Sequence, residues 1–230
     1  MTTIQNNLQM VRNRLSVSCQ LAGRDSAGVT LLAVSKTFGP DAVAEAYAAG
    51  QTAFGENYIQ EALAKITALR QLPLEWHCIG PVQSNKTRLV AEHFDWIHTV
   101  DRLKIAQRLS EQRPPHLPPL QVCIQVNVDG GPAKSGVLAQ DALALALQVA
   151  ALPNLRLRGV MSIPEPAPDF AGACAVFGRV KAVFDELRQH GLPVDTLSIG
   201  MSADLEAAVH SGSTMVRVGT AIFGARSTAV

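Results

Sequence analysis

A lysine follows directly on a short apolar run near the start of the chain. Residues 30–37 read Thr-Leu-Leu-Ala-Val-Ser-Lys-Thr, and Gly39-Pro40 ends this pattern before a helical one begins. A continuous apolar run bounded by turn residues is typical of a strand buried on both faces. At the carboxyl end of a parallel strand, partial burial lowers the pKa of a lysine and frees its amine to attack a carbonyl. Taken alone, Lys36 is either such a nucleophile or a surface lysine that marks the end of a strand.

Glycines and hydroxyl groups gather in two stretches near the carboxyl end. Residues 198–202 read Ser-Ile-Gly-Met-Ser and open a helical pattern, and residues 217–220 read Arg-Val-Gly-Thr at the end of the last apolar run. Hydroxyls and free backbone N–H groups of this kind bind anions, and the loops after strands seven and eight are the usual phosphate site of a barrel. The alternative is a pair of ordinary tight turns with a serine cap. Together with Lys36, these stretches predict one ligand with an aldehyde at one end and a phosphate at the other.

Other polar residues follow the second, third and fifth apolar runs. Asn57 either caps the next helix or bonds a ligand, and the cap is the commoner role. His77 is expected to be a core histidine with satisfied hydrogen bonds. Lys134 lies beyond Asn127 and the turn at residues 130–132, in a loop that either brings a second amine over the site or simply lies on the surface.

These residues must be positioned by a chain in which apolar runs alternate with helical patterns. The strand candidates are residues 29–35, 52–54, 74–79, 96–99, 120–126, 155–161, 196–199 and 215–218. The helical patterns cover residues 3–21, 41–49, 57–70, 84–93, 102–112, 139–151, 169–190 and 203–211. Strict alternation implies right-handed β-α-β units and a parallel sheet. Eight units predict an α/β fold, a (β/α)8 TIM barrel in a single domain at residues 1–230, with an extra N-terminal helix. The alternative is an open doubly wound sheet, but no Gly-x-Gly-x-x-Gly follows the first run.

Composition excludes several classes of protein. Hydrophobic residues make up 47% of the chain and charged residues 17%, so a large core is available. The net charge of +1, without a basic stripe, argues against nucleic-acid binding. We expect no signal peptide and no membrane span. The four cysteines are far apart and the six histidines form no ligand-spaced cluster, which predicts reduced thiols in a cytoplasmic protein and no metal site.

Seven motifs together resemble the YggS/PROSC family of pyridoxal 5′-phosphate (PLP) homeostasis proteins, in order and over almost the whole chain. They are Ala-Val-Ser-Lys at 33–36, Phe-Gly-Glu-Asn-Tyr at 54–58, His-Cys-Ile-Gly at 77–80, Gln-Ser-Asn-Lys at 83–86, Arg-Gly-Val-Met at 158–161, Ser-Ile-Gly-Met-Ser at 198–202 and Val-Arg-Val-Gly-Thr at 216–220. The resemblance implies the PLP-binding barrel of alanine racemase, fold type III, standing alone.

The resemblance also implies a cofactor site. Lys36 would hold PLP as a Schiff base, and Arg217 would face the pyridine nitrogen. Asn57 would lie near the ring. Ser202 and the backbone amides of Gly219 and Thr220 would hold the phosphate. One departure is visible, because the family usually has a glutamate where this chain has Gly131. That change puts in doubt any acidic partner for Lys134.

Two functions are compatible with these residues. PLP enzymes that need a strong electron sink place a carboxylate at the pyridine nitrogen, whereas Arg217 cannot accept a proton. An amino-acid racemase also needs a second base, which alanine racemases take from a C-terminal domain, and this chain stops at Val230. Tyr58 is the sole candidate for that base. We therefore expect an intracellular PLP carrier or regulator without robust catalysis, a monomer that serves PLP-dependent apo-enzymes, and keep a PLP-dependent racemase as the alternative.

Overall fold

The computed structural model describes residues 2–131 and 134–225, so parts of the predicted domain at residues 1–230 lie outside the described residues, as do Pro132 and Val230. The strands are β1 (Thr30–Val34), β2 (Ala53–Glu56), β3 (Glu75–Cys78), β4 (Trp96–Val100), β5 (Leu120–Asn127), β6 (Val137–Leu138), β7 (Leu155–Met161), β8 (Thr196–Ser198) and β9 (Met215–Val218). The helices are α1 (Thr3–Leu21), α2 (Pro40–Ala48), α3 (Ile59–Ala68), α4 (Thr87–His93), α5 (Leu103–Gln112), α6 (Ala142–Ala150), α7 (Phe170–Gln189), α8 (Leu205–His210) and α9 (Thr220–Phe223).

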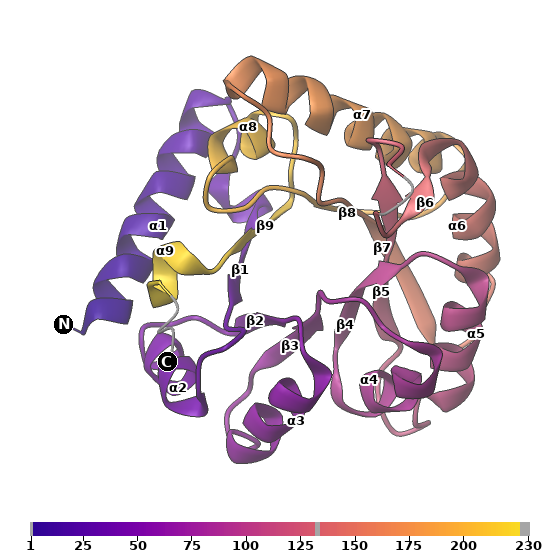
Figure 1. Cartoon of the computed structure of the whole chain (residues 1–230), viewed down its shortest axis with the longest axis horizontal. Coiled ribbons are helices and arrows are strands. Elements are labelled where there is room, and N and C mark those ends of the chain that lie inside the picture. The colour runs from indigo at the N-terminus through magenta and orange to yellow at the C-terminus, as the bar shows by residue number, and fades with distance from the viewer. Residues whose placement is uncertain (1, 132–133, 226–230) are drawn as a thin grey trace.

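The strands close into a parallel barrel that the helices surround (Figure 1). The order around the ring is β1-β2-β3-β4-β5-β7-β8-β9, and β9 pairs again with β1 through Thr30 and Met215. The two-residue β6 adds to the end of β5 and lies outside the ring. This is the (β/α)8 TIM barrel predicted from the alternation of runs, with the expected N-terminal helix before the first strand.

The N-terminal helix takes the place of a full helix after the last strand. That last helix, α9, has only four residues, and α1 packs against α8, α9 and α2 along this side of the barrel (Figure 1). Leu8, Val11, Leu15 and Cys19 recur on one face of α1 and are buried in the main core. Because the ring of helices would otherwise be open here, α1 covers the barrel wall beside β1 and β9.

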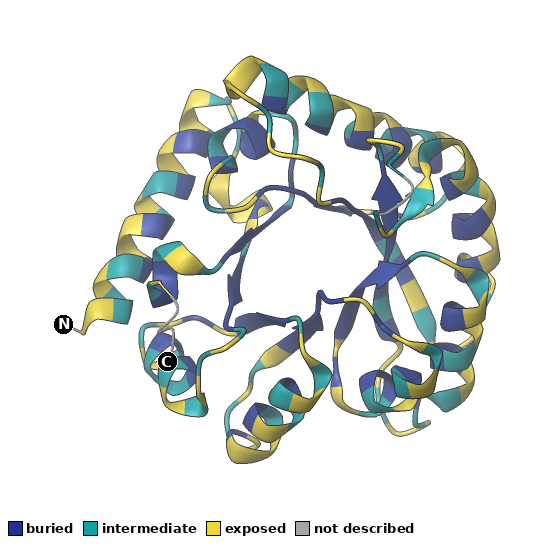
Figure 2. Cartoon of the chain, viewed as in Figure 1, coloured by how far each residue is buried: buried dark blue, intermediate teal, exposed yellow. Residues whose placement is uncertain are grey.

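The barrel has two apolar layers, one on each face of its strands, because successive side chains of a strand point to opposite faces. The larger layer lies between strands and helices, and the strands are accordingly buried on both faces (Figure 2). The smaller layer fills the barrel lumen with Leu32, Val34, Ala53, Ile79, Trp96, Cys123, Met161 and Met215. The four cysteines are free thiols, as predicted. None of the helices in the described part of the chain has the length and apolar character needed to cross a membrane.

Candidate functional site

A cavity of about 300 Å³ opens where the strands reach their carboxyl ends. All six residues singled out from the sequence line it: Lys36, Asn57, Ser202, Arg217, Gly219 and Thr220. They come from the ends of β1, β2 and β9 and from the loop after β8. The barrel therefore brings together residues that are far apart in the sequence, from Lys36 near the start of the chain to Thr220 near its end.

Lys36 stands half-buried in the cavity wall, immediately beyond β1. The next residue, Thr37, has a φ of 69°, which β-branched residues rarely adopt. Its backbone N–H donates to Oε2 of Glu61 at 3.1 Å, which holds the turn. Strained backbone of this kind persists where the surrounding structure fixes it, commonly at ligand sites.

A buried polar cluster holds the residue before the lysine. Oε1 of Glu56 accepts hydrogen bonds from the Ser35 hydroxyl at 2.5 Å and from Nζ of Lys65 at 2.7 Å. The same Nζ donates to the Ser35 carbonyl at 2.7 Å, and burial raises the pKa of Glu56. Ser35 is thus fixed through both its side chain and its backbone. Sequence reasoning missed this cluster, although Lys65 falls on the buried face of α3 with Ala62.

Asn57 is not a helix cap, and the commoner of its two predicted roles is wrong. The N-cap of α3 is Tyr58, which makes no side-chain cap bond. The Oδ1 atom of Asn57 is instead buried, and no described residue donates to it. Close approach of the segment that follows β3 fixes this backbone, because a Cβ atom added to Gly80 would lie 2.1 Å from the Asn57 carbonyl oxygen. A buried acceptor without a donor at a cavity wall is suited to a ligand N–H or O–H.

Ser202, Gly219 and Thr220 also line the cavity. As the first residue of α9, Thr220 has a backbone N–H with no acceptor inside that helix. The Ser202 carbonyl accepts a hydrogen bond from Nη1 of Arg14 at 2.7 Å. Arg14 lies on α1 and also forms a two-point pair with Glu206, at 2.5 and 2.6 Å. The N-terminal helix therefore holds this loop, a role that sequence reasoning did not find.

Arg217 lies buried at the base of the cavity. Its Nη1 donates to both the carbonyl and the hydroxyl of Ser198 at 2.7 Å, and its Nη2 donates to the Ser162 carbonyl at 2.9 Å. These bonds use three of its five N–H donors, and the others have no partner among the described residues. Burial lowers the pKa of Arg217 to about 10, so the side chain remains a cation at neutral pH.

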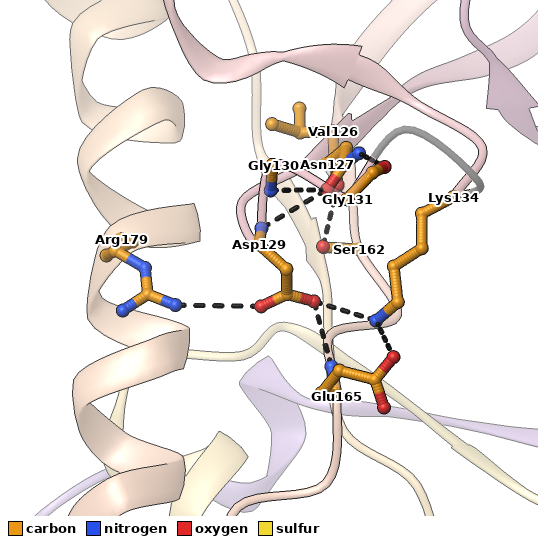
Figure 3. A network of polar contacts seen from close by, with 9 residues as sticks. All are labelled: Val126, Asn127, Asp129, Gly130, Gly131, Lys134, Ser162, Glu165 and Arg179. Carbon is orange, nitrogen blue, oxygen red and sulfur yellow. Dashed lines mark hydrogen bonds and ion pairs between the residues drawn. The ribbon is translucent and has the colours of Figure 1, made fainter.

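The contacts of Lys134, in the loop after β5, contradict the doubt about its acidic partner that the sequence raised. Despite Gly131, Lys134 has two acidic partners, Asp129 at 2.8 Å and Glu165 at 2.9 Å, and Arg179 contacts the other oxygen of Asp129 at 3.6 Å (Figure 3). These ion pairs and hydrogen bonds raise the pKa of Lys134 although desolvation opposes them. Lys134 lines a second cavity of about 220 Å³, which shares Asn57 with the first.

Two other residues named from the sequence lie away from the first cavity. Tyr58 is 55% exposed and lines neither of the two cavities described here. His77 is a buried lumen residue with hydrogen bonds to Glu75 and His98, which confirms the expected core histidine.

Comparisons with known proteins agree with this geometry. The family described as alanine racemase, N-terminal domain, matches residues 3–227. A pyridoxal phosphate homeostasis protein of Pseudomonas aeruginosa is 59% identical over 226 residues, which cover 98% of this chain and 97% of that protein. The protein of the same name from Escherichia coli K12 is 52% identical over 229 residues, which cover 98% of both chains.

Solved structures extend the comparison. PipY of Synechococcus elongatus PCC7942, solved with PLP bound, has a TM-score of 0.83 and 40% identity, over 96% of this chain and all of that one. Alanine racemase from Corynebacterium glutamicum shares the fold, with a TM-score of 0.68 and 21% identity over 99% of this chain and 61% of the enzyme. The resemblance predicted from the seven motifs is therefore confirmed: the chain belongs to the alanine racemase N-terminal domain family and, within it, to the YggS/PROSC family of pyridoxal phosphate homeostasis proteins.

Proposed function

We propose that this protein binds PLP covalently through Lys36 and acts as a carrier or regulator of the cofactor, without robust catalysis of its own. The observation that carries the proposal is the single cavity of about 300 Å³ in which an amine, a buried cation and a hydroxyl with helix-end amides face one space. The names of the relatives and the PLP-bound PipY structure support it.

The residues present fit the cofactor at each end. When bound, PLP supplies an aldehyde that a lysine amine converts to an imine with loss of water, and a ring that withdraws electrons. Lys36 holds the aldehyde carbon, while the Ser202 hydroxyl and the backbone N–H groups of Gly219 and Thr220 bind the phosphate. The unused N–H donors of Arg217 suit the lone pair of the pyridine nitrogen, and the orphaned Oδ1 of Asn57 suits a donor on the ring or its substituents.

Arg217 argues against PLP chemistry that needs a strong electron sink, but a racemase tolerates a neutral ring nitrogen, so the choice between carrier and racemase rests on the second base. A guanidinium can donate to the ring nitrogen but cannot take a proton from it or stabilise its protonated form, so the ring remains a weak electron sink. No carboxylate of the described residues forms an ion pair with Arg217 within 4.0 Å that would change this. Tyr58, the base that a racemase would need, is exposed and lies outside the cavity lining. We further propose that the protein works as a monomer in the cytoplasm and supplies PLP-dependent apo-enzymes.

A reduction experiment tests the covalent link. Purified protein incubated with PLP should be yellow, and borohydride should fix the cofactor to the peptide that contains Lys36. Lys36→Ala should abolish the visible band, whereas Lys134→Ala, which changes the other lysine near the cavities, should keep it. A stable covalent band in Lys36→Ala protein would show that the wrong lysine is assigned.

A second experiment separates the carrier from the racemase. Loaded protein should exchange the α-hydrogen of added amino acids with deuterium from the solvent very slowly, because the ring is a weak sink and no second base among the described residues lines the cavity. The loaded protein should nevertheless transfer PLP to an added apo-enzyme, and that enzyme should become active. Rapid α-deuteration or racemisation that Lys36→Ala abolishes would establish the enzyme instead, and Tyr58→Phe would then locate its second base.

A further inference from the structure

A chain of hydrogen bonds crosses the barrel lumen from solvent to Arg217. It starts at Glu75, whose side chain is 48% exposed at the amino-terminal end of β3. Oε1 of Glu75 lies 2.8 Å from Nε2 of His77, and Nδ1 of His77 lies 2.9 Å from Nε2 of His98. Nδ1 of His98 then lies 3.0 Å from the Ser198 hydroxyl, which accepts the 2.7 Å bond from Arg217.

The chemistry of the groups gives this chain one direction. The hydrogen bond from His77 lowers the pKa of Glu75, so at neutral pH its carboxylate only accepts and His77 must donate from Nε2. Burial lowers the pKa of His98 well below 6.5, which makes that ring neutral. His77 donates from Nε2 to Glu75, which leaves its Nδ1 to accept from His98.

With one donor and one acceptor on each ring, a single arrangement of hydrogens makes every bond of the chain. Arg217 donates to Ser198, Ser198 donates to Nδ1 of His98, His98 donates from Nε2 to His77, and His77 donates from Nε2 to Glu75. Both histidines are therefore Nε2–H tautomers. Hydrogen bonds that run head to tail polarise one another, so the chain strengthens its last member, the bond between Ser198 and Arg217.

Such a chain is not needed to fill a barrel. Side chains that fill a barrel lumen are mostly bulky and apolar, as Leu32 and Met161 are here. Polar networks in a low-dielectric interior are costly when links are missing, so a chain of five groups in which every link is made points to a constraint on the orientation of its last member, Arg217. That end group is a buried cation whose bonds to Ser198 and Ser162 fix its plane.

We propose that Glu75, His77, His98 and Ser198 are positioning residues for Arg217, which hold its guanidinium in the orientation that meets the pyridine nitrogen of PLP. This inference rests on the proposed function, because it assigns a partner to Arg217 within the same site. It goes beyond that function by making the PLP-binding geometry depend on groups at the opposite end of the barrel.

The first test needs no cofactor. Nitrogen-15 NMR of the apo-protein at neutral pH should show both His77 and His98 as neutral Nε2–H tautomers. An Nδ1–H tautomer or a charged ring at either position would overturn the direction of the chain. This result is independent of whether Lys36 binds PLP, so failure of the proposed function and failure of this inference are distinguishable.

The second test compares two buried serines. Ser198→Ala removes the hydroxyl that joins the chain to Arg217, and Ser213→Ala removes a hydroxyl of equal burial that bonds only backbone carbonyls. Ser198→Ala should weaken PLP binding about tenfold and shift the visible absorption of the bound cofactor, because the bond it disturbs involves a charged donor. Ser213→Ala should leave both unchanged. Equal effects of the two variants on PLP binding would overturn the proposal.

A double-mutant cycle shows whether the chain acts through Arg217. His98→Leu should weaken PLP binding in the wild-type background and have no further effect in Arg217→Met protein. Additive effects of the two substitutions would mean that His98 acts on the fold alone.

Discussion

At the scale of single residues, the role proposed for the hydroxyl of Ser202 can be measured apart from folding. Ser202→Ala removes one donor to a phosphate dianion, and loss of a hydrogen bond to a charged group costs about 1.5–3 kcal/mol. PLP should therefore bind about ten- to a hundredfold more weakly, as measured by titration of the visible absorbance. Pyridoxal, which lacks the phosphate, serves as the control ligand and should be insensitive to the change. Equal weakening for both ligands would assign Ser202 to the fold and not to the phosphate.

His98 predicts a dependence of stability on pH. Burial, with further contributions from His77 and Arg217, places the folded-state pKa of His98 well below its ordinary value of 6.5. Below pH 6.5 the unfolded chain therefore binds a proton that the folded chain does not, and the free energy of unfolding falls as the pH falls. The slope should approach about 1 kcal/mol per pH unit.

Urea unfolding of wild-type protein and of His98→Gln checks this slope. The variant lacks the titrating group, so its deficit in stability should be largest near neutral pH and should narrow as the pH falls from about 7.5 to about 5.5. A constant difference between the two proteins over this range would contradict the assignment of a low pKa to His98.

The residues proposed to bind the cofactor could be identified from the sequence because each stands next to a recognisable local pattern. Lys36 ends an apolar run, and Ser202 and Thr220 follow runs rich in glycine. The groups that hold these residues in place have no comparable pattern in the sequence. Glu56 and Lys65 read as ordinary charged residues, and their pairing follows only from the way α3 packs on β2.

At the scale of elements, α1 holds in place the loop after β8 that contains Ser202. Arg14 holds the Ser202 carbonyl, and Asn7 donates to the Ile222 carbonyl of α9 at 3.0 Å. Arg14→Met should weaken PLP binding several-fold and change thermal stability little, because its pair with Glu206 is partly exposed. The measurement is a PLP titration beside a melting curve.

A second arginine of α1 provides the matched control for this prediction. Arg12 donates to the Ala49 carbonyl at 2.7 Å and so joins α1 to the end of α2, away from Ser202. Arg12→Met should leave PLP affinity unchanged. Similar losses of affinity in both variants would mean that α1 supports the site only through general stability.

Element boundaries show what periodicity can and cannot predict. The N-terminal helix is found at residues 3–21, as expected, because an apolar stripe marks its full length. The predicted helix at residues 57–70 is shorter, since Asn57 turns into the cavity and α3 begins at Ile59. The short elements β6 and α9 could not be predicted, because two or four residues contain no measurable period.

At the scale of the whole molecule, PLP should stabilise the fold as a cross-link between distant strands. A ligand at 100 times its dissociation constant adds about 2.7 kcal/mol to the free energy of unfolding. For a chain of this size, that raises the melting temperature by about 5–10 °C. Differential scanning calorimetry with and without PLP measures the shift, and Lys36→Ala should lose most of it. No shift at saturating PLP would contradict binding to the folded barrel.

The barrel itself was predictable because eight alternations leave few possible topologies. The contact between Arg14 and Ser202 was not, because a side chain that reaches across 188 residues of sequence leaves no pattern in either segment. The same holds for the lumen chain, in which His98 and Ser198 lie 100 residues apart.

The pairing of β1 with β9 has a consequence for the nascent chain during synthesis. Lys36 leaves the ribosome early, but the ring cannot close, and α1 cannot pack against α9, until Met215 and the residues after it have emerged. A nascent chain whose β9 is still inside the ribosome therefore has the amine but neither the cation nor the helix-end amides of the site. We therefore expect affinity for the cofactor to appear only after β9 and Thr220 have emerged from the ribosome.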